Sequence, residues 1–200
     1  MSTYNLDESL AVKTTGTQRI DQSGAYVGVI TMAYEIIAAT GTGGVLIDFK
    51  RDDGAVAKGV RLYTKKQDGT ILSGLNVLNA IMKCMGVQQI TGVNKSVMVY
   101  DHDDGKEVAK QKLVFSELGG KKIGVVIQME EYEYNGEVKN KANIVNAFNA
   151  ETRQLPIEVI QNREASILDK IVKKLKDKRL PEPSPNPFTT PNHAHQDPYN

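Results

Sequence analysis

A pair of strand-like runs joined by Asn135-Gly136 constrains the fold of this chain more than any other feature. The runs cover residues 122–134 and 138–148. Asn-Gly favours the left-handed backbone that a two-residue hairpin turn requires. Apolar residues alternate along the first run and so share one face of a strand: Ile123, Val125, Ile127 and Met129. The sequence therefore predicts a β-hairpin that presents one face to a hydrophobic core.

Three more strand-like runs precede this hairpin, at residues 24–37, 45–51 and 56–65. They are rich in β-branched and aromatic residues, and glycine-containing turn signals at residues 41–44 and 53–54 separate them. Alternation in the third run places two sets of side chains on opposite faces: Val56, Val60 and Leu62 toward the core, and Arg61, Tyr63 and Lys65 toward solvent. We therefore expect a third strand that is buried on one face only.

A helix follows the third strand. Ser73 is a suitable N-terminal cap, and Gly86 stands where a glycine ends a helix. Apolar residues recur between them at helical spacing: Leu75, Leu78, Ile81, Met82 and Met85. Residues 93–116 then form a polar insertion, in which residues 97–100 and 108–115 are expected to pair as a small hairpin.

The order of these elements, three strands, a helix and two strands, predicts the fold class. It is typical of a mainly β chain folded as a five-stranded OB-fold-like barrel, with the helix closing one end. We expect this domain over residues 24–160, with the hairpin inserted at 93–116 and a short edge strand at 154–160.

Three segments lie outside the expected domain. Residues 1–23 are polar and predict a flexible N-terminal arm. Residues 161–180 predict a basic amphipathic helix, helical from 163 to 179, whose stripe serves as a lid on the barrel or as a dimer contact: Ile167, Leu168, Ile171, Val172 and Leu175. Residues 181–200 are rich in proline and poor in apolar residues, which predicts a disordered tail.

Bulk properties exclude several classes of protein. A net charge of +1 excludes a uniformly basic coat for nucleic acid, so that electrostatic binding requires local clusters. Cys84 is the only cysteine, which excludes an intramolecular disulfide and a multi-cysteine zinc site. No stretch resembles a signal peptide or a membrane span, so we expect a soluble cytoplasmic protein.

No pattern in the chain predicts catalysis. Neither a nucleophile elbow nor a Cys/His pair is present, and carboxylates occur together only in surface runs. His193, His195 and Asp197 lie in the proline-rich tail, and residues 101–105 lack the spacing of a calcium loop. We therefore expect a protein that is not an enzyme, with no metal or other cofactor.

The first candidate binding site is a basic and aromatic cluster on the second and third strands, with only Asp52 and Asp53 as acidic neighbours. Its members are Phe49, Lys50, Arg51, Lys58, Arg61, Tyr63, Lys65 and Lys66. Cations follow the phosphates of a single strand, and aromatic faces stack on its bases. The alternative is an ordinary solvated strand face with extended lysines.

The second candidate site is the hairpin around Asn135-Gly136. Two aromatic residues precede the turn and two cations follow it: Tyr132, Tyr134, Lys139 and Lys141. In an OB fold the loop between the last two strands commonly contacts the ligand. The alternative is that the neighbouring glutamates pair with those lysines: Glu130, Glu131, Glu133 and Glu137.

Three segments resemble a family of tailed-phage proteins that bind single-stranded DNA and have an OB-like fold. They are GAYVGVITMAYEI, GLNVLNAIMKCMGV and GGKKIGVVIQMEEYEYNGEVKNKANIVNAF, and the resemblance covers roughly residues 20–150. It implies sequence-tolerant coating of single-stranded DNA during phage DNA replication or recombination, in the cytoplasm of the host cell. It identifies no contact residue individually.

The tail departs from the acidic recruitment tail that many such proteins carry. It holds only Glu182 and Asp197 as acids, with Phe188 as its strong apolar residue. Docking of replication or recombination proteins through this tail stays an alternative to a simple unstructured end, and a homo-oligomer stays open. The rival functions are a phage virion structural or assembly protein, and a protein-binding recombination accessory or nuclease inhibitor.

Overall fold

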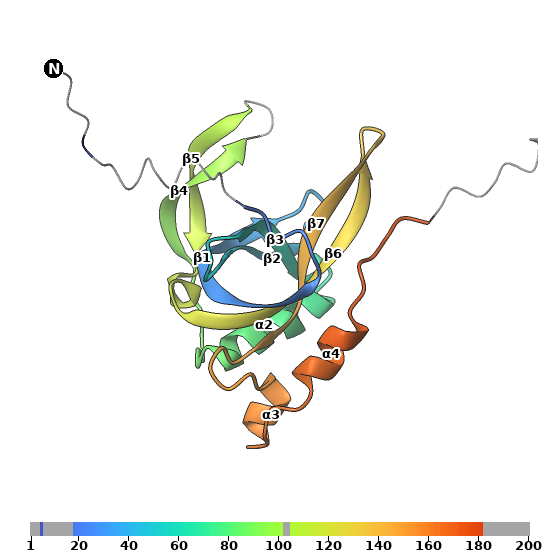
Figure 1. Cartoon of the computed structure of the whole chain (residues 1–200). Helices are drawn as coiled ribbons and strands as arrows, with labels where there is room; N and C mark the ends of the chain where they lie inside the picture. Colours follow the sequence, from blue (N-terminus) through green and yellow to red (C-terminus); the bar gives the residue numbers. More distant parts are fainter. Residues whose placement is uncertain (1–4, 6–17, 102–104, 182–200) are drawn as a thin grey trace, which may run out of the picture.

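The computed structural model describes residue 5, residues 18–101 and residues 105–181 (Figure 1). Seven antiparallel strands form one sheet: β1 Gly24–Ile37, β2 Gly43–Arg51, β3 Val56–Lys65, β4 Val93–Asp101, β5 Lys106–Val114, β6 Lys122–Tyr134 and β7 Glu137–Phe148. The helices are short: α2 Ser73–Cys84, the 3₁₀ turn η1 Ser116–Leu118, α3 Pro156–Ile160 and α4 Leu168–Lys174. The prediction of a mainly β chain is confirmed.

Strand β1 organises the sheet because it has partners along its whole length. Its first part, from Gly24 to Val29, pairs with β6, and its later part pairs with β2. Tyr34 also pairs with Val114 of β5. β2 pairs with β3, β4 with β5, and β6 with β7. Within the described ranges no ladder joins β3 to β7, so the sheet is not closed.

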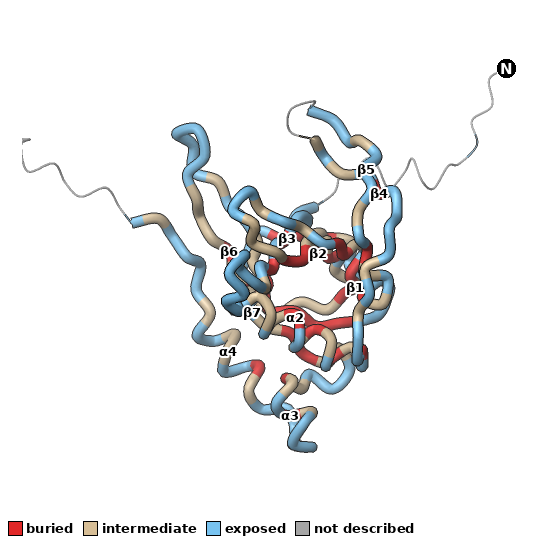
Figure 2. The backbone as a smooth tube through the Cα atoms, turned by 180° about the vertical axis from the view of Figure 1, so that it is seen from behind, coloured by how far each residue is buried: buried red, intermediate tan, exposed pale blue. Residues whose placement is uncertain are grey.

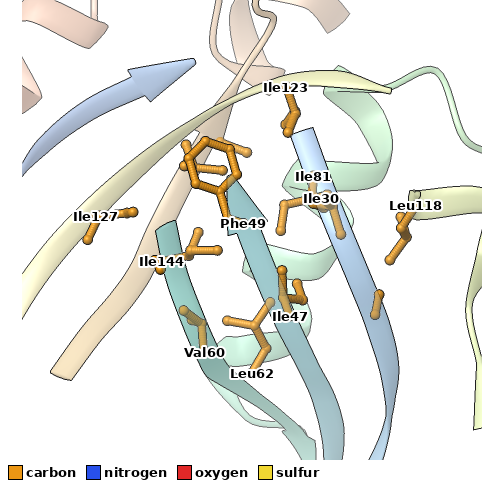
Figure 3. Packing of buried hydrophobic residues seen from close by; sticks show 14 of the residues in the cluster. Ile30, Ile47, Phe49, Val60, Leu62, Ile81, Leu118, Ile123, Ile127 and Ile144 are labelled. Carbon is orange, nitrogen blue, oxygen red and sulfur yellow. The ribbon is translucent and has the colours of Figure 1, made fainter. Parts of the chain in front are cut away.

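The main hydrophobic core lies between the β1–β3 strands, the β6–β7 strands and α2 (Figure 3). Its central side chains are fully buried, among them Ile30, Ile47, Phe49, Ile81 and Ile123. Each such side chain stabilises the fold by about 1.5–3 kcal/mol relative to an exposed one. All four alternating residues of β6 belong to this cluster, as the sequence predicted.

Helix α2 ends as predicted but begins differently. Gly86 has a φ of +67°, and the Val87 N–H donates to the Met82 carbonyl at 2.8 Å. This is the glycine-terminated helix end that the sequence predicted. Ser73 is not the cap, however: it is the first helical residue, and Leu72 precedes it without a side-chain capping bond.

The predicted burial of Val56 was wrong, although Val60 and Leu62 are buried as expected. Ala57 is buried in place of Val56 because the ladder between β2 and β3 shifts register near Gly59. Gly59 has a φ of +68°, and its N–H donates to the Asp48 carboxylate at 2.6 Å. Such a bulge inverts the inside-outside alternation on its two sides.

The predicted edge strand at 154–160 was also wrong, because residues 156–160 form helix α3. Pro156 suits the first position of a helix. Glu158 is 1% exposed, and its carboxylate accepts hydrogen bonds from the backbone N–H groups of Leu155, Ser166 and Ile167. These bonds tie α3 to the segment that leads into α4.

The predicted helix over 163–179 is shorter than expected, since α4 spans only Leu168–Lys174. The bonds to Glu158 hold the preceding residues outside the helix. After α4 the chain runs beside β6, where the Lys178 N–H donates to Met129 at 2.9 Å. The apolar stripe packs against Val126 and Phe148, so it covers the outer face of β6 and β7.

The N-terminal arm was predicted to extend to residue 23, but it ends earlier. Ile20 is buried in the main core, and its N–H donates to Val56 at 2.9 Å. No helix in the described ranges is both long and apolar enough to cross a membrane. Nearly all of the proline-rich tail, residues 182–200, lies outside the described residues, as do His102 and the acids that follow it.

Candidate nucleic-acid interface

The exposed side of β3 presents cations around one tyrosine. Lys58, Arg61 and Lys65 are exposed, and Tyr63 is 36% exposed. Gly44 of β2 lies opposite Tyr63 in the ladder, so the residue directly across from the tyrosine has no side chain. The predicted orientation of β3 toward solvent is therefore confirmed for Arg61, Tyr63 and Lys65.

Acidic residues near this surface are already engaged elsewhere. Asp53 accepts from Arg51, which lowers the pKa of the Asp53 carboxyl to about 2. Asp52 pairs with Lys122 of β6 at 2.7 Å, and Asp48 accepts from the Gly59 backbone. The remaining cations form no ion pair with any described residue: Lys50, Lys58, Arg61, Lys65 and Lys66. These five residues and Tyr63 are called the β3 face below.

Two members of the first predicted cluster do not belong to the β3 face. Phe49 is 0% exposed and lies in the main core, because it shares the inward side of β2 with Ile47. It has no surface on which a base could stack. Arg51 pairs with Asp53 and lies over the Tyr26 ring, 5.4 Å from its centroid. The positive charge of Arg51 is therefore engaged by groups of the protein itself.

Sequence reasoning missed a cation that strand β5 brings to the neighbouring surface. Lys112 Nζ lies 5.7 Å from the centroid of the Tyr34 ring in β1. Burial raises the pKa of Tyr34, Asp48 adds to this rise, and the positive charge of Arg61 opposes it. Arg61 and Lys112 thus both act on Tyr34 from different strands. The signal available in the sequence was the alternation of Lys110 and Lys112, which places both on one face of β5.

The four residues of the second predicted site lie on the β6–β7 hairpin. Asn135 and Gly136 have φ values of 53° and 77°, as the two-residue turn requires. Lys139 Nζ lies 4.8 Å from the Tyr134 ring centroid, and Lys141 Nζ lies 5.7 Å from that of Tyr132.

Both hairpin lysines also have acidic partners. Lys139 pairs with Glu137 at 3.3 Å, and Lys141 pairs with Glu130 at 3.1 Å. The alternative interpretation of pairing with glutamates is therefore confirmed for these two lysines. Tyr134 remains 55% exposed beside Lys139, so its ring still offers an aromatic surface.

Two long hairpins rise from the same end of the molecule. In both views the β4–β5 and β6–β7 hairpins stand apart, with β2 and β3 between them (Figures 1 and 2). Figure 2 shows that the hairpin ends are largely exposed, while buried residues concentrate in the sheet below. The arrangement places exposed cations on a sheet and an exposed tyrosine, Tyr134, on a projecting hairpin. This combination suits a flexible polyanion with aromatic groups.

The described residues offer little for other chemistry. They contain no group of three histidine, cysteine or acidic side chains arranged to hold a metal ion. Burial raises the pKa of the Cys84 thiol to about 11, which keeps it protonated and unreactive. In comparisons with known proteins, no protein-family model matches the chain and no curated protein matches it.

Proposed function

We propose that the protein binds single-stranded DNA without strong sequence preference through the β3 face. The observation that carries this proposal is the absence of ion-pair partners, within the described residues, for the five cations of that face. Their acidic neighbours are engaged with other groups. When such unpaired cations contact phosphates, they release the counter-ions condensed on the nucleic acid. This release is the main source of sequence-independent affinity.

We further propose that β1, β2, β3, α2, β6 and β7 form an OB fold into which the β4–β5 hairpin is inserted. Three features support this assignment: β1 pairs with both β2 and β6, β7 pairs with β6, and α2 contacts both β3 and β7. In OB folds the second and third strands and the loop between the last two strands bind oligonucleotides. The β3 face and the β6–β7 hairpin occupy these positions.

Each part of the site has a distinct role in this proposal. Arg61, Lys65 and their neighbours follow the phosphates, while Tyr63 and Tyr134 stack on bases. Stacking contributes about 1–3 kcal/mol per base and tolerates any sequence, because every base has an aromatic face. The site needs no chemical step, so the protein acts as a binding protein rather than an enzyme.

The cellular setting follows from the phage resemblance. We propose that the protein coats single strands during phage DNA replication or recombination in the host cytoplasm. Recruitment of replication or recombination proteins through the proline-rich tail belongs to the same proposal.

Competition between nucleic acids tests the function directly. A fluorescent thymidine homopolymer should bind tightly, and an unlabelled single strand should displace it at much lower concentration than a duplex of equal length. The reason is that a duplex offers phosphates but no unpaired bases. Equal competition would remove the stacking argument. Absence of salt-dependent binding would instead favour a virion part or a protein-binding accessory.

A further inference from the structure

The β4–β5 hairpin meets the sheet on the same side as the β3 face. Tyr34 of β1 lies opposite Leu46 of β2, and Leu46 lies opposite Arg61 of β3. Tyr34 also lies opposite Val114 of β5, at the single residue pair that joins β5 to β1. Directly opposed residues of antiparallel strands share one face. One row of side chains therefore runs from the hairpin across β1 and β2 to Arg61 of the β3 face.

Packing shows which face of the hairpin is turned toward the sheet. Val97 of β4 and Val114 of β5 are buried and cluster with Tyr34. Lys95 of β4 lies opposite Lys112 of β5, and strand alternation places both on the same face as these two valines. Lys112 Nζ accordingly lies 5.7 Å from the centroid of the Tyr34 ring. Lys95 and Lys112 are called the β4–β5 lysine pair below.

No described acid neutralises this pair. Lys95 Nζ donates to the Ser116 hydroxyl at 2.7 Å, which leaves its charge uncompensated. Neither lysine forms an ion pair with any residue that the structure describes. Asp48, which shares its face of β2 with Leu46, accepts from the Gly59 N–H at 2.6 Å. Like charges directly opposite each other destabilise a sheet, so the hairpin carries an electrostatic cost.

A cross-strand pair of like charges departs from the pairing that stabilises a sheet. Proteins depart from such local rules chiefly at functional sites. Two lysines without an acid lose their mutual repulsion when an anion lies between or beside them. Because the row of side chains that begins at this hairpin ends at Arg61, a polyanion bound on the β3 face would extend toward the lysine pair.

We propose that the β4–β5 lysine pair binds phosphate groups of the same single strand that the β3 face binds. The inference rests on the proposed function and adds a second contact surface to it. In both views the β4–β5 hairpin stands beside β2 and β3 (Figures 1 and 2). The hairpin lies between α2 and β6 in the chain, so it adds a contact that the OB-fold elements named above do not supply.

Substitution of each lysine by glutamine, in the full-length chain, tests the proposal. Affinity for a labelled thymidine homopolymer should fall about fivefold for Lys95→Gln or Lys112→Gln at about 100 mM salt, and about 25-fold for the double variant. The loss should vanish as the salt concentration approaches about 1 M, where counter-ion release no longer favours binding. Lys95→Gln can still donate to Ser116, and its melting temperature should not fall, because repulsion within the pair is removed.

Lys110→Gln is the matched control. Lys110 lies two residues before Lys112 on the same face of β5, but its Nζ pairs with Asp101 at 2.6 Å. The net charge changes equally in Lys110→Gln and Lys112→Gln. Affinity should therefore change less than about twofold in the control, since an ion-paired lysine contributes little to counter-ion release.

Chemical acetylation of the unmodified protein provides a second measurement that needs no variant. Mass spectrometry should show that bound thymidine homopolymer protects Lys95 and Lys112 from acetylation and leaves Lys110 as reactive as before. This measurement keeps the proposal testable if a substitution disturbs the hairpin.

The outcomes separate this inference from the proposed function. Suppose that Arg61→Ala with Lys65→Ala weakens binding while the double variant of the lysine pair binds like the parent. The inference would then be wrong and the proposed function would stand. An equal loss in Lys110→Gln, or no protection of the lysine pair, would also overturn the inference. Absence of salt-dependent binding by the parent would overturn both.

Discussion

Removing two cations from the β3 face should change the salt dependence of DNA binding by a calculable amount. Each phosphate contact to a single strand contributes about 0.7 to the slope of log affinity against log salt. Five unpaired cations therefore allow a slope of about −3.5, and Arg61→Ala with Lys65→Ala should reduce it to about −2.1. Between 50 and 200 mM salt, the parent should lose about 100-fold in affinity and the double variant about 20-fold.

Fluorescence anisotropy with a labelled thymidine homopolymer, repeated at several salt concentrations, measures this slope. The matched control is Lys83→Ala with Lys173→Ala, which removes two exposed lysines from α2 and α4. Alanine preserves both helices, and the net charge changes equally in the two double variants. The control should keep the parent slope. A folded Arg61/Lys65 variant with an unchanged slope would refute the assignment of phosphate contacts to β3.

The remaining predictions concern stacking and stability. Tyr63→Leu should weaken binding by about 1 kcal/mol or more without changing the salt slope, as titration with the same oligonucleotide would show; parental affinity would make Tyr63 a packing residue. Gly124→Ala should destabilise the fold by about 1–3 kcal/mol in chemical denaturation, because the new Cβ would lie 2.2 Å from the Phe148 ring. Hydrogen bonds from backbone N–H groups hold the pKa of Glu158 below its usual value of 4.5. Its stabilising contribution should therefore be present above pH 4.5 and be lost as the pH falls through its folded pKa. Glu158→Gln should lower the melting temperature at pH 7 and flatten its dependence on acid pH; an unchanged profile would contradict this role.

Most strands could be predicted because they depend on features of the local sequence: runs of β-branched and aromatic residues, and the turn signals between them. The bounds of β1, β3 and β6 agree with the sequence analysis to the residue. The bulge at Gly59 could not be predicted, because it depends on the Asp48 carboxylate of the adjacent strand. Helix α3 was mistaken for a strand for a similar reason. Its apolar residues suit either structure, and the deciding contact joins Glu158 to the N–H groups of residues 166 and 167.

The residue types of the candidate binding site were predictable, but which of its cations are paired with acids was not. A run of lysines and arginines is visible in the sequence, yet which of them are neutralised depends on tertiary contacts. Asp52 is occupied by Lys122, a partner 70 residues away. Phe49 looked like a stacking residue because it adjoins Lys50, whereas the alternation of β2 turns it inward. Lys112 reaches Tyr34 only because β5 pairs with β1.

The cations of the β3 face and the lysines of the β6–β7 hairpin differ in the interactions that they lose when they bind a phosphate. A cation of the β3 face exchanges only water and mobile counter-ions. Lys139 and Lys141 must share or leave Glu137 and Glu130, and those carboxylates then stay near the incoming phosphate and repel it. An exposed ion pair contributes only about 0–1 kcal/mol, so breaking it costs little free energy. The repulsion by the remaining acid disfavours the hairpin further. The phosphates should therefore follow β3, and the hairpin should contribute chiefly its exposed tyrosine ring.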